Sequence, residues 1–396
     1  MNKLKRIVCI FLTLCFTVTL TSCGEKPPQE VTPSGTTEKT ENKETSVLSL
    51  NKEYVSHYEW YKDTSTMLVR SEYTDVTLDE ATEKTYPLLA KTLAETSVMR
   101  KRTMEDEKDN FIAMSTDEFE SNNEAFSTYV STLDVQVRRA DSVAVSILED
   151  YGAEGSRSFN GLNYDTESGK ELGLADVFID SSKIPATVEK EIMSRIGEDE
   201  PDGDTAVIEY FKNTPDDSIT WTLDYNGVAF YFNPGDIAPT NFGIQVVTVT
   251  FAEHPDLFKE KYTIVPEEYV VSLPASAPFY ADITGDKKTE ELTVSSHYDE
   301  DTKFYHTISI NSETSEFETE WFSYIEPYYA KTADGKSYLC VFSVNNEEEG
   351  KDFTLNVYSF EKGKVKLLTT SKTGLDCKGE NIFALPADPS ELVSVR

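Results

Sequence analysis

The clearest chemical pattern in this chain is a run of oxygen donors in the segment Asp282-Ile283-Thr284-Gly285-Asp286-Lys287-Lys288-Thr289-Glu290. Side-chain oxygens stand at its first, third, fifth and ninth positions, on Asp282, Thr284, Asp286 and Glu290. The backbone carbonyl of Lys288 offers a further oxygen at the seventh position. Calcium binds about six to eight hard oxygen atoms around a tight turn. These residues are therefore candidate calcium ligands.

This segment resembles the calcium loops of integrin-like and EF-hand-like repeats. It departs from them at two positions, because Thr284 is a weak ligand and Lys287 stands where glycine is usual. An aspartate-rich turn between two strands is the alternative interpretation, and the sequence leaves both open. The segment occurs once, which does not support a multi-bladed propeller.

Cys23 is a candidate for covalent modification. A basic head at residues 3–6 precedes an apolar stretch from Ile7 to Leu20, which leads into Thr21-Ser22-Cys23. This order is typical of a secretory signal peptide, and the apolar stretch is short for a membrane span. The cysteine after the small residues resembles a bacterial lipobox, so we expect cleavage after residue 22 and lipidation of Cys23. An uncleaved anchor and an ordinary cleaved signal are the alternatives.

The other reactive residue types form no pattern typical of an enzyme. The four histidines (His57, His254, His297 and His306) are scattered outside HExxH and HxH motifs. The sequence contains no GxSxG, P-loop, GxGxxG or catalytic carbohydrate-deacetylase signature. With 71 acidic residues, carboxylate pairs arise by chance and carry little information. We therefore expect no catalytic residues.

Two further cysteines, Cys340 and Cys377, remain after the signal peptide and Cys23 are set aside. An exported location permits a disulfide between them, and two unpaired buried thiols are the alternative. Neither cysteine lies in a CxxC motif or a cluster with histidine, so we expect no zinc site around them.

The chain is strongly acidic, with a formal net charge of −34. Cleavage after residue 22 would remove three of the 37 basic residues and none of the 71 acidic ones, which leaves −37. Such a charge argues against nucleic acid as a partner and against electrostatic docking on anionic lipid. It favours cationic partners and divalent metal, and it equally suits simple solubility.

Composition divides the chain into segments. Residues 1–22 form the predicted signal peptide, and residues 23–48, rich in Pro, Thr, Glu and Lys, are predicted to be a disordered tether. Folded sequence is expected from near Leu48. We predict one module over residues 49–274 and a small all-β domain over residues 275–396.

Periodicity predicts an α+β fold for the first module. Apolar and polar residues alternate over 133–137 and 142–147, as in half-buried strands of an antiparallel sheet. Helices are predicted from Pro87, with an apolar stripe on one face, and over residues 181–198. Asn226-Gly227 predicts a tight hairpin turn with positive φ angles. The predicted fold class is an antiparallel sheet with two or three helices, followed by a small all-β C-terminal domain.

Two segments of this module resemble a known extracellular family. The first contains Gly161-Leu162-Asn163-Tyr164-Asp165, Gly169-Lys170-Glu171-Leu172 and Asp176-Val177-Phe178, and the second contains Trp221-Thr222-Leu223, the run from Asn226 to Pro239, and Gly243 to Phe251. Both are similar to the lysozyme-binding ectodomain of the anti-sigma-V factor, a module that also accompanies the catalytic domain of some peptidoglycan deacetylases. The likeness covers residues 50–270 in pattern and is most specific over 160–178 and 221–251. At Thr240-Asn241-Phe242-Gly243 the chain departs from the family's usual Tyr-Ala-Ala-Gly-like step.

This resemblance implies a non-catalytic binding or sensing module at the outer face of a Gram-positive-type membrane, held there by a lipid anchor. The implied ligand is a cationic wall-active protein of the lysozyme kind, or wall glycan itself. Because loops often carry binding residues, the candidate contacts are Pro234, Asp236, Pro239, Asn241 and Phe242. The chain lacks the sigma-binding segment of the anti-sigma relatives, so we do not expect signalling of that kind. An accessory protein or enzyme acting on peptidoglycan, and a purely structural envelope protein, are the alternatives.

Overall fold

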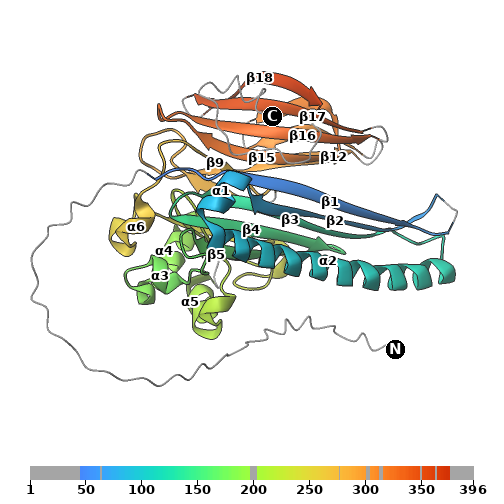
Figure 1. Ribbon diagram of the computed structural model, residues 1–396, viewed down its shortest axis with the longest axis horizontal. Coiled ribbons are helices and arrows are strands. Elements are labelled where there is room, and N and C mark those ends of the chain that lie inside the picture. The colour runs from blue at the N-terminus through green and yellow to red at the C-terminus, as the bar shows by residue number, and fades with distance from the viewer. Residues whose placement is uncertain are drawn as a thin grey trace, which may run out of the picture. The chain divides into compact units, whose positions relative to one another are not determined.

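The alternating segments of the first half of the chain form a five-stranded sheet with the strand order β1-β2-β3-β4-β5 (Figure 1). The structure is a computed structural model that describes residues 45–62, 65–196, 203–275, 277–299, 304–311, 315–347, 350–361 and 364–374. The strands are β1 (Leu50–Trp60), β2 (Met67–Leu78), β3 (Tyr129–Ala140), β4 (Ala144–Ala153) and β5 (Ser156–Asp165). Both alternating segments noted in the sequence fall on β3 and the start of β4.

One pair of neighbours in this sheet is parallel. β2 runs parallel to β3, whereas the other neighbours are antiparallel. Parallel strands need a long crossover connection, which is supplied by α1 (Glu80–Thr85) and α2 (Pro87–Ser121). Asp79 caps α1 by accepting a hydrogen bond from the backbone N–H of Thr82 at 2.7 Å. α2 begins at Pro87, as predicted, and runs along one face of the sheet (Figure 1).

The predicted apolar stripe of α2 is narrower than expected. Leu89, Leu93 and Met104 are buried, and Met104 follows Leu93 by about three helical turns. Leu88 and Met99 are exposed, because each lies off the line that faces the sheet. α2 therefore packs on the sheet through one face, on which Arg100 and Ser115 are also buried.

A second layer combines short helices with a three-stranded sheet of order β6-β7-β8. The strands are β6 (Trp221–Leu223), β7 (Gly227–Phe232) and β8 (Gln245–Thr250), and the helices are α3 (Leu174–Val177), α4 (Ile184–Ile196), α5 (Gly203–Asn213) and α6 (Glu260–Thr263). Four 3₁₀ turns, η1 (Ser181–Lys183), η2 (Asp216–Ser218), η3 (Thr240–Phe242) and η4 (Pro255–Leu257), connect them. α4 buries Ile184, Val188 and Ile192, which recur every four residues, in one cluster with the apolar side chains of β7 and β8.

The predicted hairpin is present, but its turn differs from the prediction. β6 pairs with β7 around residues 224–227, yet neither Asn226 nor Gly227 has a positive φ. Gly227 is required for close packing, because a Cβ there would lie 2.3 Å from the carbonyl oxygen of Val249 on β8. The Asn-Gly pair therefore predicted the hairpin correctly, but Gly227 is needed for close packing against β8 and not for a positive φ angle.

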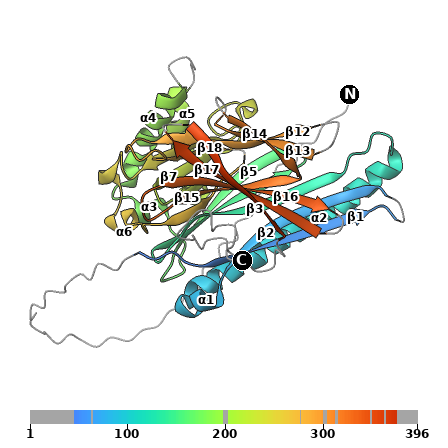
Figure 2. The same cartoon turned by 90° about the horizontal axis from the view of Figure 1, so that it is seen from above.

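Strands form all the regular structure in the described residues after Ser272. The largest sheet has the order β18-β17-β16-β15-β9, and two smaller sheets contain β10-β11 and β12-β13-β14. Their bounds are β9 (Tyr269–Ser272), β10 (Phe279–Ala281), β11 (Glu290–Leu292), β12 (Val294–Asp299), β13 (Phe304–Ile310), β14 (Ser315–Phe322), β15 (Tyr324–Lys331), β16 (Ser337–Glu347), β17 (Gly350–Glu361) and β18 (Lys364–Gly374). Seen from above, β15–β18 lie over the first sheet (Figure 2).

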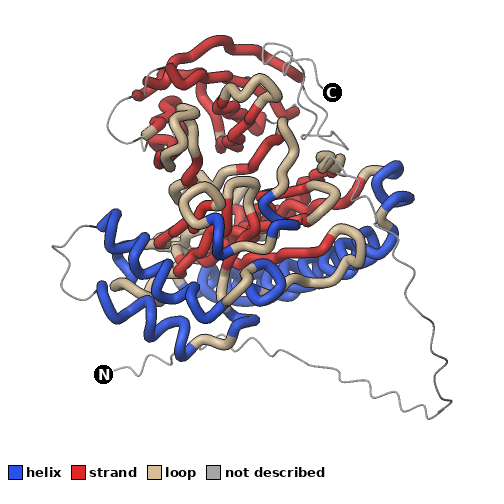
Figure 3. The backbone as a smooth tube through the Cα atoms, turned by 90° about the vertical axis from the view of Figure 1, so that its left-hand side faces the viewer, coloured by secondary structure: helices blue, strands red, loops and turns tan. Residues whose placement is uncertain are grey.

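The predicted fold class is confirmed, with more helices than expected. The described residues contain six α-helices, of which α1, α3 and α6 have only four to six residues. Figure 3 shows the helices gathered toward one side of the molecule and the C-terminal strands on the other. Among the helices in the described ranges, none combines the length and apolar character needed to cross a membrane.

The predicted segment boundaries can be compared with the described part of the chain. Val47 forms an isolated bridge with Asp141 and Leu48 is buried, so the chain joins the fold near the expected residue. β9 lies before the predicted boundary at 274/275 but pairs with β15, which lies after it. The division into two domains stays a prediction. The signal peptide and the tether up to residue 44 lie outside the described residues.

Candidate functional site

A cleft of about 560 Å³ lies between the first sheet and the C-terminal strands, and we call it the intersheet cleft. Its volume is typical of small-molecule sites. One wall comes from β1 to β5 and the other from β9, β13, β15 and the chain after β9. The residues used below are, from the first wall, Lys52, Tyr54, Arg70, Glu72, Asp134, Gln136, Asp150 and Arg157, and from the second, Ser272, Tyr305, Tyr324, Glu326 and Tyr328.

Strand alternation places the polar side chains on this wall. In β3, Asp134 and Gln136 line the cleft, whereas Val135 and Val137 belong to an apolar core cluster. Successive side chains of a strand point to opposite faces of the sheet. The polar residues of the alternating pattern over 133–137 therefore form part of the first wall of the cleft.

Three charged side chains from the two walls form an ion cluster centred on Lys52. Its ammonium Nζ lies 3.0 Å from Oδ1 of Asp134 on β3 and 3.8 Å from Oε1 of Glu326 on β15. Burial alone would lower the pKa of Lys52, but the two carboxylates outweigh burial and raise it. Burial alone would raise the pKa of Asp134, but Lys52 outweighs it and lowers that pKa. The Lys52 ammonium thus pairs with one carboxylate from each wall and joins the two walls.

The other charged side chains of the cleft are also paired. Arg70 Nη2 donates to Oε2 of Glu72 at 2.7 Å, and Arg157 Nε donates to Oδ1 of Asp150 at 2.7 Å. Burial raises the pKa of Asp150, and Arg157 offsets only part of that effect. Every carboxylate of the lining thus has a basic partner. In a chain with a net charge of −34, this cleft is close to neutral.

Tyrosines and unpartnered polar atoms complete the cleft. Tyr54 of β1 and Tyr324 of β15 stack across it, with ring centroids 6.4 Å apart and planes inclined by 13°. Within the described part of the chain, Oε1 of Gln136 and Oγ of Ser272 have no hydrogen-bond partner, although both residues are about 96% buried or more. Buried polar atoms are normally hydrogen-bonded. Both atoms are themselves covered by protein, so a molecule in the cleft would reach them only after neighbouring side chains move.

The structure brings together three of the predicted calcium ligands. Carboxylate oxygens of Asp282, Asp286 and Glu290 lie within 4.8 Å of one another. Thr284 Oγ1 donates to Oε1 of Glu290 at 2.7 Å, so it braces the loop. The N–H of Lys288 donates to Oδ1 of Asp286 at 2.9 Å. Calcium binding stays a prediction.

The predicted binding loop lies outside the cleft lining. Pro239 precedes the 3₁₀ turn η3, in which Asn241 is exposed and Phe242 has 51% of its surface exposed. Asp236 accepts a hydrogen bond from the N–H of Asn233 at 2.7 Å, which closes the turn that contains Pro234. Phe242 is therefore an exposed aromatic residue of this loop, and its role stays a prediction.

The predicted cysteine chemistry lies largely outside the described residues. Cys23 and Cys377 are both outside them. Cys340 lies on β16, is buried and has a free thiol in the structure, and burial raises its pKa to about 12. The disulfide between Cys340 and Cys377 stays a prediction, as does lipidation of Cys23.

Sequence reasoning missed the cleft because its residues are far apart in the chain. Lys52 and Glu326 meet only because β15 lies across from β1. The available signal was the polar half of the alternation in β1, β2 and β3. That alternation shows which residues share a face and does not show what the face meets.

Comparison with curated proteins gave no match. Two solved structures are similar in part. One is a DUF3298 family member from Bacteroides fragilis, with 15% identity and a TM-score of 0.41, covering 55% of this chain and 96% of that one. The other is a DUF3298 family protein from Pseudomonas aeruginosa, with 13% identity and a TM-score of 0.37, covering 55% of this chain and 97% of that one. Residues 175–252, which run from α3 to just beyond β8, match the family described as protein of unknown function (DUF3298).

Proposed function

We propose that this protein is a non-catalytic cell-surface binding module whose ligand site is the intersheet cleft and whose ligand is wall glycan. The observation that carries the proposal is the cleft of about 560 Å³ itself, which is lined by tyrosines and paired charges and has unpartnered polar atoms of Gln136 and Ser272 buried in its walls. The module resemblance over 160–178 and 221–251 supports a role at the cell wall.

A glycan suits this cleft for chemical reasons. Sugars carry many hydroxyl groups that both donate and accept, so a sugar could satisfy Oε1 of Gln136 and Oγ of Ser272 once a shift of neighbouring side chains uncovers them. Tyrosine rings offer broad apolar faces to the C–H groups of a sugar ring, and their hydroxyls tolerate a polar ligand. Because three lining cations offset three of the four lining carboxylates, the cleft carries little net charge and suits an uncharged ligand.

Binding of soluble muropeptides, and of the same glycan without its peptide, tests the proposal by calorimetry. Gln136→Leu and Tyr324→Ala should each weaken binding about tenfold, which is about 1.4 kcal/mol. Trp60→Ala removes an exposed aromatic of β1 outside the lining and should leave affinity unchanged. Equal affinity in all four proteins, or no binding at tens of micromolar, would reject the cleft as a glycan site.

A basic wall-active protein of the lysozyme kind is the second candidate ligand. The net charge of −37 in the cleaved chain supports it, since such a charge accelerates encounter with a basic protein. Phe242, exposed on its loop, supplies an aromatic contact of the kind that anchors protein interfaces. Phe242→Ala should weaken lysozyme binding and leave glycan binding intact, whereas Gln136→Leu should do the reverse.

We further propose that lipidation of Cys23 holds the protein at the outer face of the membrane. The motif over residues 3–23 supports this location. Metabolic fatty-acid labelling should place acylated protein in the membrane fraction. A Cys23→Ala variant that stayed equally processed and membrane-bound would contradict the anchor.

A further inference from the structure

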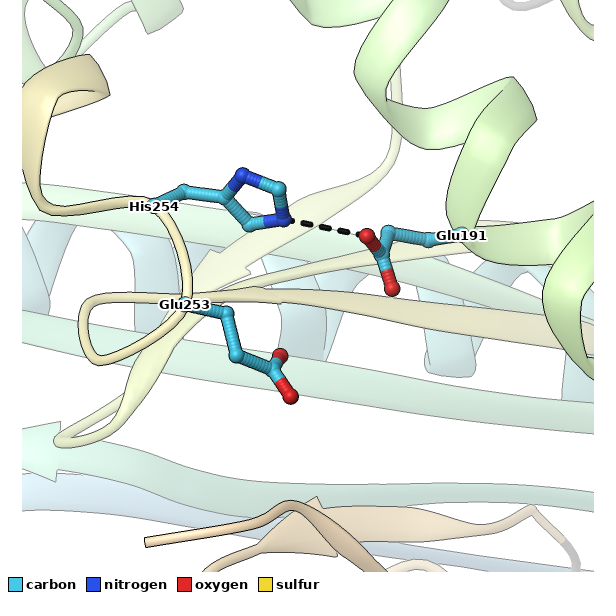
Figure 4. A group of neighbouring side chains, drawn as sticks. All are labelled: Glu191, Glu253 and His254. Carbon is cyan, nitrogen blue, oxygen red and sulfur yellow. Dashed lines mark hydrogen bonds and ion pairs between the residues drawn. The ribbon is translucent and has the colours of Figure 1, made fainter.

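A second group of side chains with chemical potential lies away from the intersheet cleft, where the turn after β8 meets α4. Figure 4 shows Glu191 on α4 facing His254, with Glu253 on the same turn as His254. None of the three lines the cleft. Neither the sequence motifs nor the proposed glycan site uses them.

The geometry brings three metal-ligand atoms together. Nε2 of His254 lies 3.0 Å from Oε1 of Glu191, and one ligand atom from each of the three residues lies within 4.8 Å of the others. The side chains of His254 and Glu191 are 18% and 17% exposed, while Glu253 is exposed. The group is thus partly enclosed, with one flexible ligand on its open side.

Contacts within the fold orient each of the three candidate ligands. Glu191 stands beside Ile192, which packs with the core under α4, so the helix fixes its backbone, and the contact with His254 orients its carboxylate. The N–H of His254 donates to the carbonyl of Thr250 at 3.1 Å, which fixes the turn. Oε2 of Glu253 accepts from Oγ1 of Thr250 at 2.8 Å, an arrangement that orients this carboxylate and leaves its Oε1 for another partner.

We propose that Glu191, Glu253 and His254 bind a divalent transition-metal ion, with Zn²⁺ as the best fit. One imidazole nitrogen with two carboxylates suits zinc, whereas calcium and magnesium prefer oxygen ligands alone. Zinc ligands lie about 2.0–2.2 Å from the ion, which in a tetrahedron sets the ligand atoms about 3.4 Å from one another. Nε2 of His254 and Oε1 of Glu191, now 3.0 Å apart, would separate slightly, and the Glu253 carboxylate would move to a similar distance from both. The exposed side chain of Glu253 can make that movement, and a water molecule would complete the coordination.

The electrostatics of the group favour a cation. Two carboxylates share this small space with one histidine, and like charges so close together repel each other. A divalent ion removes that repulsion and bridges α4 to the turn after β8. The bound metal therefore stabilises the packing of α4 on the small sheet.

Calorimetric titration of chelator-treated, purified full-length protein with ZnCl₂ tests the site. We expect one zinc ion whose affinity falls at least about tenfold in Glu191→Gln, Glu253→Gln and His254→Gln. Glu253→Gln alters an exposed side chain, so it keeps the test valid if a more buried variant fails to fold. With Co²⁺ in place of Zn²⁺, the visible absorption band of the bound ion should disappear in the same variants.

His306→Gln is the matched control. Nε2 of His306 lies 3.7 Å from a single carboxylate, that of Asp299, and this pair belongs to no three-ligand group in the described residues. The substitution should leave zinc affinity unchanged. Absence of zinc binding at hundreds of micromolar, or binding that survives Glu253→Gln and His254→Gln together, would overturn the proposal. Zinc binding that is lost instead in Asp282→Asn would also overturn it.

Discussion

Lys287 occupies the position of the Asp282–Glu290 loop where calcium loops usually hold glycine, and its φ is +69°. A left-handed backbone costs a residue with a Cβ about 1–2 kcal/mol. The loop accepts this cost because Asp282 receives hydrogen bonds from the N–H groups of Gly285 at 2.8 Å and Lys287 at 3.1 Å. The carboxylates of Asp282 and Glu290 thus hold the turn through backbone hydrogen bonds.

For this loop we predict a calcium-dependent rise in melting temperature, because an ion would relieve the repulsion among Asp282, Asp286 and Glu290. The double variant Asp282→Ala plus Asp286→Ala should lose the rise. Thermal-shift titration with CaCl₂ measures it, and MgCl₂ serves as the control ion. A melting temperature that does not change up to millimolar calcium would identify the loop as an ordinary turn.

Cys340 should be unreactive in the folded protein. Burial raises its pKa from about 9 to about 12, and only the thiolate reacts quickly. The unfolded chain loses the thiol proton above about pH 9 while the folded chain retains it, so this group lowers stability as pH rises from there toward 12. Iodoacetamide should label Cys340 only in denaturant. Failure to label it in denaturant without reductant would instead support the disulfide with Cys377.

At the level of elements, a buried ion pair joins β3 to the hairpin of β6 and β7. Nη2 of Arg138 lies 2.5 Å from Oδ2 of Asp224, and Nη1 of Arg138 donates to the carbonyl of Ser272 at 2.6 Å. Thr222 Oγ1 donates to Oδ1 of Asp224 at 2.8 Å. Three segments that are distant in sequence therefore meet at one guanidinium.

Asp224→Asn should lower the free energy of unfolding by about 3–5 kcal/mol, because it leaves the Arg138 guanidinium buried without its counter-ion. Asp217→Asn, at an exposed carboxylate in η2, should change it by less than about 0.5 kcal/mol. Chemical denaturation followed by circular dichroism compares the two. Equal stability of both variants would mean that Arg138 finds another partner or stays solvated.

Individual helices and strands were largely predictable from the sequence, whereas the contacts between elements distant in the chain were not. Pro87 correctly indicated the start of α2, and period-two alternation identified the cores of β3 and β4. α5 went unrecognised, because its residues 203–213 give a short apolar pattern next to a Pro-Asp-Gly segment typical of turns. The parallel pairing of β2 with β3 also escaped prediction, since alternation has the same period in both pairings.

Because sequence patterns report local order and not contacts between distant elements, they revealed one candidate metal site and missed the other. The calcium-type loop is contiguous, so its ligand set could be read from spacing alone. Glu191 and His254 are separated by β6, β7 and β8, and only the packing of α4 against β8 brings them to 3.0 Å. Single histidines carry no such information in a sequence.

At the scale of the whole molecule, a strongly acidic chain contains a cleft whose own charges are paired. An acidic surface would attract a basic protein over a distance limited by salt, about 8 Å at physiological ionic strength. A glycan in the proposed site would instead be held by direct contacts, which salt hardly screens. Two kinds of ligand should therefore respond to ionic strength in different ways.

We predict that association with lysozyme slows markedly as salt rises, whereas glycan affinity changes little. Biolayer interferometry at low and high salt measures both, with the same immobilised protein. A glycan affinity that falls in parallel with lysozyme binding would mean that the ligand contacts charged groups, so the paired ions of the cleft would have to open on binding. If neither ligand binds at tens of micromolar, the acidic surface serves solubility, and a structural role in the envelope accounts better for a chain of this charge.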